Sequence, residues 1–190
     1  MLFVSEFIKL ILLLCNSRTK NPTEIFLVGF LFLINTYNMN QLDPQFISIM
    51  SILVPKIIIS TICGLIIGYD REIKQKVAGI RTNILICVGC TILTAISFEL
   101  VKYNVHIDPT RIIGQIITGV GFLGAGVIMK NDDKIVGVTT AAFIWVASAI
   151  GILVGCTSSF LAPIVLTFGL LVISRIFENV ETYLKNKNRG

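Results

Sequence analysis

Residues 135–174 have the sequence IVGVTTAAFIWVASAIGILVGCTSSFLAPIVLTFGLLVIS, a run of 40 residues without a charged side chain. As a single helix this run would be about 60 Å long, twice the thickness of the hydrocarbon core of a bilayer. It therefore predicts two transmembrane helices. The small and polar residues from Gly155 to Ser159 mark the turn between them, and Pro163 follows where the second helix begins.

The composition of the whole chain is typical of a polytopic membrane protein. Of its 190 residues, 54% are hydrophobic and only 14% are charged. We predict an all-α fold, a membrane helix bundle with five transmembrane helices at about residues 46–69, 82–100, 110–129, 135–155 and 160–177. In the first of these, Lys56 is expected to lie near one interface and to extend its amine toward water.

Residues 1–40 form a hydrophobic N-terminal extension whose crossing of the membrane is left open: neither of its two apolar segments is a convincing span alone, and insertion of both as a hairpin would place Arg18 and Lys20 on the cytoplasmic side. Residues 2–15 contain Glu6 and Lys9, and the apolar part of residues 25–34 is too short to cross a membrane. A signal peptide is not expected, because the extension has no basic N-terminal stretch and no small-x-small cleavage site. The transmembrane domain is then expected over residues 41–178, followed by a short basic tail at residues 179–190.

The distribution of basic residues predicts the orientation in the membrane. The segments that five spans place on one side hold ten Lys and Arg residues, whereas the opposite loops hold only Lys102 and Arg111. The basic loops and the C-terminus are therefore predicted to be cytoplasmic. This asymmetry explains the net charge of +5, and nothing in it indicates a nucleic-acid partner.

One face of the second predicted helix carries a polar stripe formed by Asn83, Cys87, Cys90, Thr91, Thr94 and Ser97. Because lipid offers no hydrogen-bond partner, the stripe is expected to face protein or water. In the favoured interpretation its hydroxyls bond to carbonyls of neighbouring helices. The alternative is a narrow polar seam for ions.

Small residues line faces of three other predicted helices, which indicates tight helix packing. Gly64-x-x-x-Gly68 and Gly151-x-x-x-Gly155 have the spacing that lets two helix backbones approach closely. A further ridge is expected in the third helix, formed by Gly114, Thr118, Gly121 and Ala125. Around Gly151 the small face continues with Gly137, Thr140, Ala141, Ala147 and Ser148.

Charged residues gather where the first two predicted helices meet. Asp70, Arg71 and Glu72 end one helix and Arg81 begins the next, so we expect these four residues to form an internally paired network, with Lys74 in a solvated loop. On the opposite side, Asp108 and Pro109 predict a helix start, with Asp108 as N-cap and Arg111 in the first turn.

Two further motifs do not predict a binding site. Cys87-x-x-Cys90 would place two thiols on one helix face, but no third ligand is expected at the same depth, so we predict two buried cysteines and no metal site. Residues 119–124 match G-x-G-x-x-G, yet the strand and the acidic residue of a dinucleotide site are missing. The five cysteines predict no disulfide framework, and no catalytic constellation or cofactor site is recognised.

Three separate segments together resemble the MgtC/SapB family of bacterial inner-membrane proteins. They are GLIIGYDREIKQKVAGIRTNILICVG from Gly64, DPTRIIGQIITGVGFLGAGVIM from Asp108, and GVTTAAFIWVASAIGILVG from Gly137. Asp70 stands where the family pattern has Glu. Residues at matching family positions, with the packing glycines, are the functional or structural candidates: Asp70, Arg71, Glu72, Arg81, Thr82, Asn83, Cys87, Asp108, Arg111, Gly119, Gly121, Gly124, Gly126, Thr139, Thr140, Trp145, Gly151 and Gly155.

The resemblance implies a non-enzymatic protein that serves growth in low magnesium and, in pathogens, virulence and survival inside macrophages. It also implies docking onto a partner, the membrane ATP synthase, and many members carry a soluble C-terminal domain that we do not expect here. The alternative is a transporter or channel for Mg²⁺ or another cation. A homo-oligomer in the lipid bilayer agrees with either function.

Overall fold

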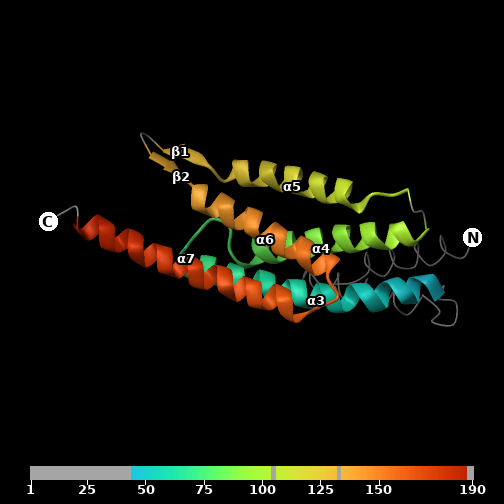
Figure 1. Cartoon of the computed structure of the whole chain (residues 1–190). Coiled ribbons are helices and arrows are strands. Elements are labelled where there is room, and N and C mark those ends of the chain that lie inside the picture. The colour runs from blue at the N-terminus through green and yellow to red at the C-terminus, as the bar shows by residue number, and fades with distance from the viewer. Residues whose placement is uncertain (1–43, 104–105, 132–133, 188–190) are drawn as a thin grey trace, which may run out of the picture. The chain divides into compact units, whose positions relative to one another are not determined.

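The computed structural model describes residues 44–103, 106–131 and 134–187 as a helical bundle (Figure 1). Its helices are α3 (Pro44–Ile73), α4 (Ile80–Tyr103), α5 (Pro109–Gly126), α6 (Val138–Cys156) and α7 (Leu161–Lys187). Each predicted span falls on one of these helices, which confirms the all-α bundle. The N-terminal extension of residues 1–40 lies outside the described residues, and the packing described below is that within the unit Ile49–Gly190.

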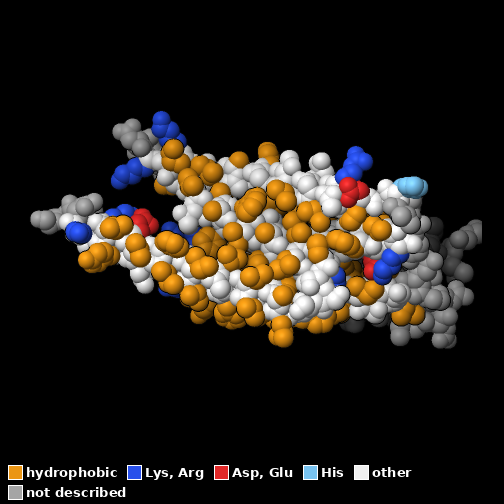
Figure 2. Space-filling view, in the orientation of Figure 1, with side chains coloured by type: hydrophobic (Ala, Val, Ile, Leu, Met, Phe, Trp, Pro, Cys, Tyr) orange, Lys and Arg blue, Asp and Glu red, His pale blue; other side chains and the backbone are white. Residues whose placement is uncertain are grey.

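Four of these helices are long and apolar enough to cross a membrane, at Ile47–Ile73, Ile80–Lys102, Val138–Cys156 and Leu161–Lys187. The remaining helix, α5, has 18 residues, and Arg111 and Gln115 lower the mean hydropathy of its first half. Its crossing of the membrane stays a prediction. Apolar side chains cover the middle of the face shown in Figure 2, while charged side chains gather toward its ends.

The connection between α5 and α6 differs from the prediction. Helix α5 ends at Gly126, and an antiparallel hairpin of β1 (Met129–Asn131) and β2 (Lys134–Val136) follows, with Lys130 opposite Ile135. The expectation of helix through residue 129 and again from residue 135 was therefore wrong. Gly137 explains the break before α6, because its φ is 93° and a Cβ there would lie 2.0 Å from the Val127 carbonyl oxygen.

The last helix also extends beyond its predicted end at residue 177. Helix α7 continues to Lys187, with Lys185 Nζ 2.5 Å from Glu181 Oε1 one turn earlier. A helix does not need hydrocarbon to persist, and such i,i+4 pairs support an exposed helix. The hydrophobic run therefore predicted the apolar part of α7 and missed its polar extension.

Glycines bring α3, α4 and α6 into backbone contact, as their spacing predicted. A Cβ on Gly64 would lie 2.7 Å from Ile84 Cα, and one on Gly68 would lie 2.5 Å from Ile80 Cα. On α6, a Cβ on Gly151 would lie 2.4 Å from the Cys87 carbonyl oxygen. Helix α6 also contacts α5 and α7, which makes it the central helix of this packing (Figure 1).

The predicted small-residue ridge of α5 does not pack within the described part of the chain. Its four residues, Gly114, Thr118, Gly121 and Ala125, are all exposed, and a Cβ on either glycine would meet nothing within 4 Å. Helix α5 instead buries Ile116, Val120 and Gly124. The prediction was wrong about the side that packs, because larger apolar residues on the neighbouring face fill the space against α6.

Candidate functional site

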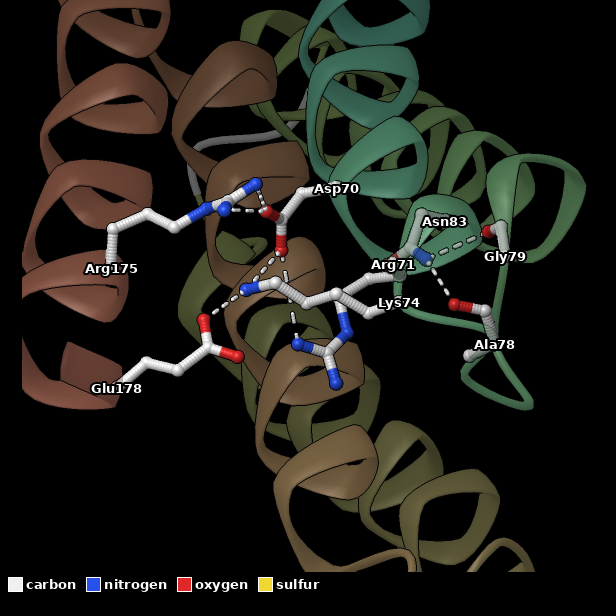
Figure 3. A network of polar contacts seen from close by, with 8 residues as sticks. All are labelled: Asp70, Arg71, Lys74, Ala78, Gly79, Asn83, Arg175 and Glu178. Atoms are coloured by element: carbon white, nitrogen blue, oxygen red, sulfur yellow. Dashed lines mark hydrogen bonds and ion pairs between the residues drawn. The ribbon is translucent and has the colours of Figure 1, made fainter. Parts of the chain in front are cut away.

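A cluster of charges joins the end of α3 to the middle of α7 (Figure 3). Asp70 is 6% exposed, and its Oδ1 accepts a hydrogen bond of 3.1 Å from Arg175 Nε and lies 2.9 Å from Arg175 Nη2 in an ion pair. Its Oδ2 lies 3.1 Å from Lys74 Nζ, which in turn lies 2.6 Å from Glu178 Oε2. One buried carboxylate thus holds cations from two helices that are far apart in the sequence.

Arg71 is buried beside this cluster, with 2% of its surface exposed. Its Nη1 lies 3.9 Å from Asp70 Oδ2, and its guanidinium lies over the Phe143 ring of α6, 4.1 Å from the ring centroid. Its Nε and Nη2 have no hydrogen-bond partner within the described residues. A buried guanidinium held by one carboxylate and one aromatic face is costly, so its position depends on both contacts.

The predicted charge network is therefore wrong in two of its four members. Glu72 faces the loop instead, where its Oε2 accepts a hydrogen bond of 3.1 Å from the Ile80 N–H and so caps the start of α4. Gly79 leaves room for this cap, because a Cβ there would lie 1.9 Å from Glu72 Oε2. Arg81 is exposed and makes no ion pair with any described residue.

The sequence missed the actual partners, Lys74, Arg175 and Glu178. Lys74 was assigned to a solvated loop, yet only 13% of its side chain is exposed. The one available signal was the position of Arg175, the first charge after the 40-residue apolar run. No local pattern reveals that α7 returns to lie beside the end of α3.

The polar stripe of α4 is closed by neighbouring helices, so the expectation that it faces protein is confirmed. The expected hydroxyl bond to a carbonyl of a neighbouring helix is made by Thr91, whereas Ser97 bonds to the Thr94 carbonyl oxygen of α4 itself. Five of its six residues are fully buried, and Cys90 is 5% exposed. Thr91 Oγ1 lies 2.8 Å from the Gly151 carbonyl oxygen of α6 and 2.9 Å from Ser60 Oγ of α3. Cys87 Sγ lies 3.1 Å from the Ala147 carbonyl oxygen. These bonds join α4 to α3 and α6, the two helices whose glycines also contact it.

Two oxygens of the stripe lack a partner within the described part of the chain. Asn83 Nδ2 donates to the carbonyl oxygens of Ala78 and Gly79, at 3.0 and 2.8 Å, but its Oδ1 is unbonded. Thr94 Oγ1 is also buried and unbonded. Buried oxygens without partners are uncommon in proteins and mark positions that a ligand or water can occupy.

Lys56 has a partner inside the bundle, in contrast to the expected extension toward water. Its Nζ donates to the Gly155 carbonyl oxygen near the end of α6. A cation at a helix C-terminus satisfies a free carbonyl and complements the helix dipole.

The third thiol excluded by the sequence analysis does lie near Cys87 and Cys90. Cys63 of α3 belongs to the same buried cluster. Even so, no three His, Cys, Asp or Glu side chains among the described residues are grouped closely enough to hold a metal ion.

The remaining candidate residues divide between the interior and the surface. Four of them are buried: Thr140, Gly124, Gly151 and Gly155. Seven are exposed: Thr82, Arg111, Gly119, Gly121, Gly126, Thr139 and Trp145. Asp108 caps α5 as predicted, with its Oδ1 2.9 Å from the Thr110 nitrogen and 2.7 Å from Thr110 Oγ1. The candidates thus do not converge on one site.

An apolar groove of about 800 Å³ runs between α4 and α5. Its walls include Gly89 of α4 and Gly119 of α5, and Ile116 and Ile144 lie among its lining residues. A Cβ on either glycine would meet nothing within 4 Å. Two candidate residues, Thr82 and Gly119, line this groove.

Comparisons with a family model and with curated proteins agree on one family. The MgtC family model matches residues 57–183. An uncharacterized protein of Haemophilus influenzae is 37% identical over 73% of this chain and 60% of its own length. Protein SapB of Bacillus subtilis is 43% identical, over 53% of this chain and 46% of that protein. The putative magnesium transporter YhiD of Escherichia coli is 40% identical, over 66% of this chain and 60% of that protein.

The matched region spans about half to 60% of the length of these curated relatives. No solved structure matches the chain. The family model covers the charge cluster, the polar stripe and the groove together, and the helices are those of a bacterial membrane protein. The chain therefore belongs to the MgtC family.

Proposed function

We propose that this is a non-enzymatic inner-membrane protein that docks onto a helix of another membrane complex. The family resemblance suggests the ATP synthase as that complex, and adaptation to low magnesium and survival inside macrophages as the setting. The same proposal places the basic loops and the C-terminus in the cytoplasm and takes residues 41–178 as the transmembrane domain.

The groove between α4 and α5 is the observation that carries the proposal. Helices in lipid associate through close packing, since hydrocarbon surrounds them in either state. Small residues along a groove allow the close approach that such packing needs, and Gly89 and Gly119 provide it here. The exposed ridge of Gly114, Thr118, Gly121 and Ala125 continues this surface on the outer side of α5.

The closed polar stripe favours docking over ion conduction. Thr91 and Cys87 bond directly to backbone oxygens of α6. Opening a water-filled path along the stripe would break these bonds and the glycine contacts at Gly151 and Gly155. The groove needs no such rearrangement, because it is already open at the surface of the described residues.

The test is to fill the groove without disturbing the fold. Gly119→Trp places a large side chain in the groove, and Gly169→Trp on α7 is the matched control, because a Cβ at Gly169 also meets nothing within 4 Å. Affinity purification from native membranes grown in low magnesium should recover ATP synthase subunits with the wild type and with Gly169→Trp, and much less with Gly119→Trp. Equal recovery with both variants, or no stoichiometric membrane partner with the wild type, would refute the proposal.

Cation transport is the second candidate, and the unbonded oxygens of Asn83 and Thr94 favour it. Hard cations such as Mg²⁺ prefer oxygen ligands, and the related Escherichia coli protein is named a putative magnesium transporter. The purified protein in liposomes should then carry Mg²⁺, and Asn83→Ala should lower the flux. No flux, or the same flux with Asn83→Ala, would remove this candidate.

A further inference from the structure

A second groove, of about 650 Å³, lies between α3 and α7. Apolar side chains, among them Leu65, Phe168 and Val172, line most of it. Its polar lining residues are Tyr69, Asp70, Arg175 and Asn179, and the Asp70 carboxylate is paired with Arg175. Phe168 and Val172 are 53% and 57% exposed, so the described residues leave this wall uncovered. The groove belongs to a different pair of helices from the proposed docking groove.

Arg175 marks the end of this groove that lies toward a membrane surface. Arg175 is the first charged residue after the charge-free run and lies about 21 Å along α7 from Leu161 at 1.5 Å per residue, so its long side chain has to extend to the edge of a hydrocarbon core about 30 Å thick. Acidic and basic residues continue beyond it, at Glu178, Glu181 and Lys185. The apolar wall therefore faces the acyl chains, and Arg175 reaches the level of the headgroups.

The charges at this end leave an excess of one positive charge. Arg71, Lys74 and Arg175 surround Asp70, and Glu178 adds the second carboxylate. Arg175 uses Nε and Nη2 on a single oxygen of Asp70, which leaves Nη1 for another acceptor. Its side chain is 57% exposed, so an anion from the bilayer can reach it.

We propose that the groove between α3 and α7 binds an anionic phospholipid. The phosphate pairs with Arg175, and one acyl chain lies along Leu65, Phe168 and Val172. Basic pockets between membrane helices at a membrane surface are known to select anionic headgroups. A zwitterionic lipid would bring a compensating ammonium group to a site that already has excess positive charge, so it fits less well.

The experiment measures lipid binding by native mass spectrometry of the full-length protein in detergent. Dioleoyl phosphatidylglycerol and dioleoyl phosphatidylcholine are the probes, added at equal concentrations. The wild type should retain phosphatidylglycerol several-fold more, and Arg175→Gln should lower this preference about fivefold, the effect of one basic group near the headgroups. Arg175→Lys should keep most of the preference for phosphatidylglycerol. Lys185→Gln is the control, because it removes an exposed charge of the same helix outside the groove, and it should keep the full preference.

A second pair of variants tests the acyl-chain site and leaves the ion pair with Asp70 intact. Val172→Trp fills the groove, whereas Val165→Trp lies on the same helix, is 65% exposed and does not line it. Val172→Trp should lose bound phosphatidylglycerol and Val165→Trp should retain it. Equal retention of the two lipids by the wild type, or of phosphatidylglycerol by the two Trp variants, would overturn the proposal. If Arg175→Gln fails to accumulate in the membrane, the comparison of Val172→Trp with Val165→Trp still tests the proposal.

Discussion

Replacing Gly151 with alanine tests the packing on which the bundle depends. The added Cβ would lie 2.4 Å from the Cys87 carbonyl oxygen and 2.9 Å from Cys90 Cβ. Because the nearest atom belongs to the backbone, no side-chain rotation relieves the clash. Helices α4 and α6 must separate by about 1 Å to restore an ordinary contact.

The substitution changes the free energy of unfolding through two costs and one gain. Overpacking a helix interface by one methyl group costs about 1 to 3 kcal/mol. The Thr91 hydrogen bond to the Gly151 carbonyl oxygen, now 2.8 Å, would also stretch, at a cost of about 0.6 kcal/mol in a membrane. Alanine gains up to about 1 kcal/mol over glycine in helix propensity. The free energy of unfolding should fall by about 1 to 3 kcal/mol, a roughly 5- to 150-fold change in the unfolding constant.

The assay is unfolding in mixed detergent micelles with increasing sodium dodecyl sulfate, followed by circular dichroism. Gly169→Ala is the control, because a Cβ there meets nothing within 4 Å and should leave stability unchanged or slightly raised. If Gly151→Ala unfolds at the same detergent fraction as Gly169→Ala, α6 does not lie against α4 as described, and the argument from glycine contacts is refuted.

Three further predictions concern the charges, the cap of α5 and its exposed ridge. Lys74→Ala should lower the free energy of unfolding by about 1.5 kcal/mol, since Lys74 pairs with buried Asp70, whereas exposed Arg81→Ala should change it by less than about 0.5 kcal/mol in the same assay. Hydrogen bonds from the Thr110 hydroxyl and backbone N–H lower the pKa of Asp108. The carboxylate of Asp108 therefore stabilises α5 fully above the unfolded pKa of about 3.9, and this stabilisation is lost as the pH falls through the lower pKa of the folded state. Hydrogen exchange in the first turn of α5 should therefore be faster in Asp108→Ala than in the wild type at pH 7, with no difference below both pKa values. Gly121→Leu should leave unfolding unchanged, because nothing lies within 4 Å of the added carbon.

The helices could be predicted from the sequence because hydrocarbon imposes a strong and local requirement. A run without charges must cross the membrane, and a polar stripe must face protein, so Thr91 and Thr94 were placed in the interior correctly. The spacing of Gly64 and Gly68 likewise predicted a close approach of backbones. Each of these inferences needed only the residues of one helix.

The candidate site depended on pairings between helices, and there the sequence was insufficient. Several acceptors and cations lie at the same level of the bundle, and the chain order favours neighbours such as Arg81 over distant partners. Asp70 nevertheless pairs with Arg175, 105 residues away, because α7 lies beside α3. The hairpin between α5 and α6 was missed for a different reason, since its six residues are too few for a clear alternating pattern.

Substitutions in the exposed ridge of α5 can distinguish an effect on docking from an effect on helix packing, whereas substitutions at Gly151 cannot. A substitution at Gly151 changes the fold, so any loss of function it causes has two explanations. A Cβ at Gly121 would meet no atom of another element within 4 Å, so Gly121→Leu tests the outer surface alone. If that surface docks onto a partner helix, Gly121→Leu should impair growth in low magnesium while the purified protein unfolds like the wild type. Normal growth with normal stability would show that the ridge faces only lipid, and docking would then have to rest on the groove beside it.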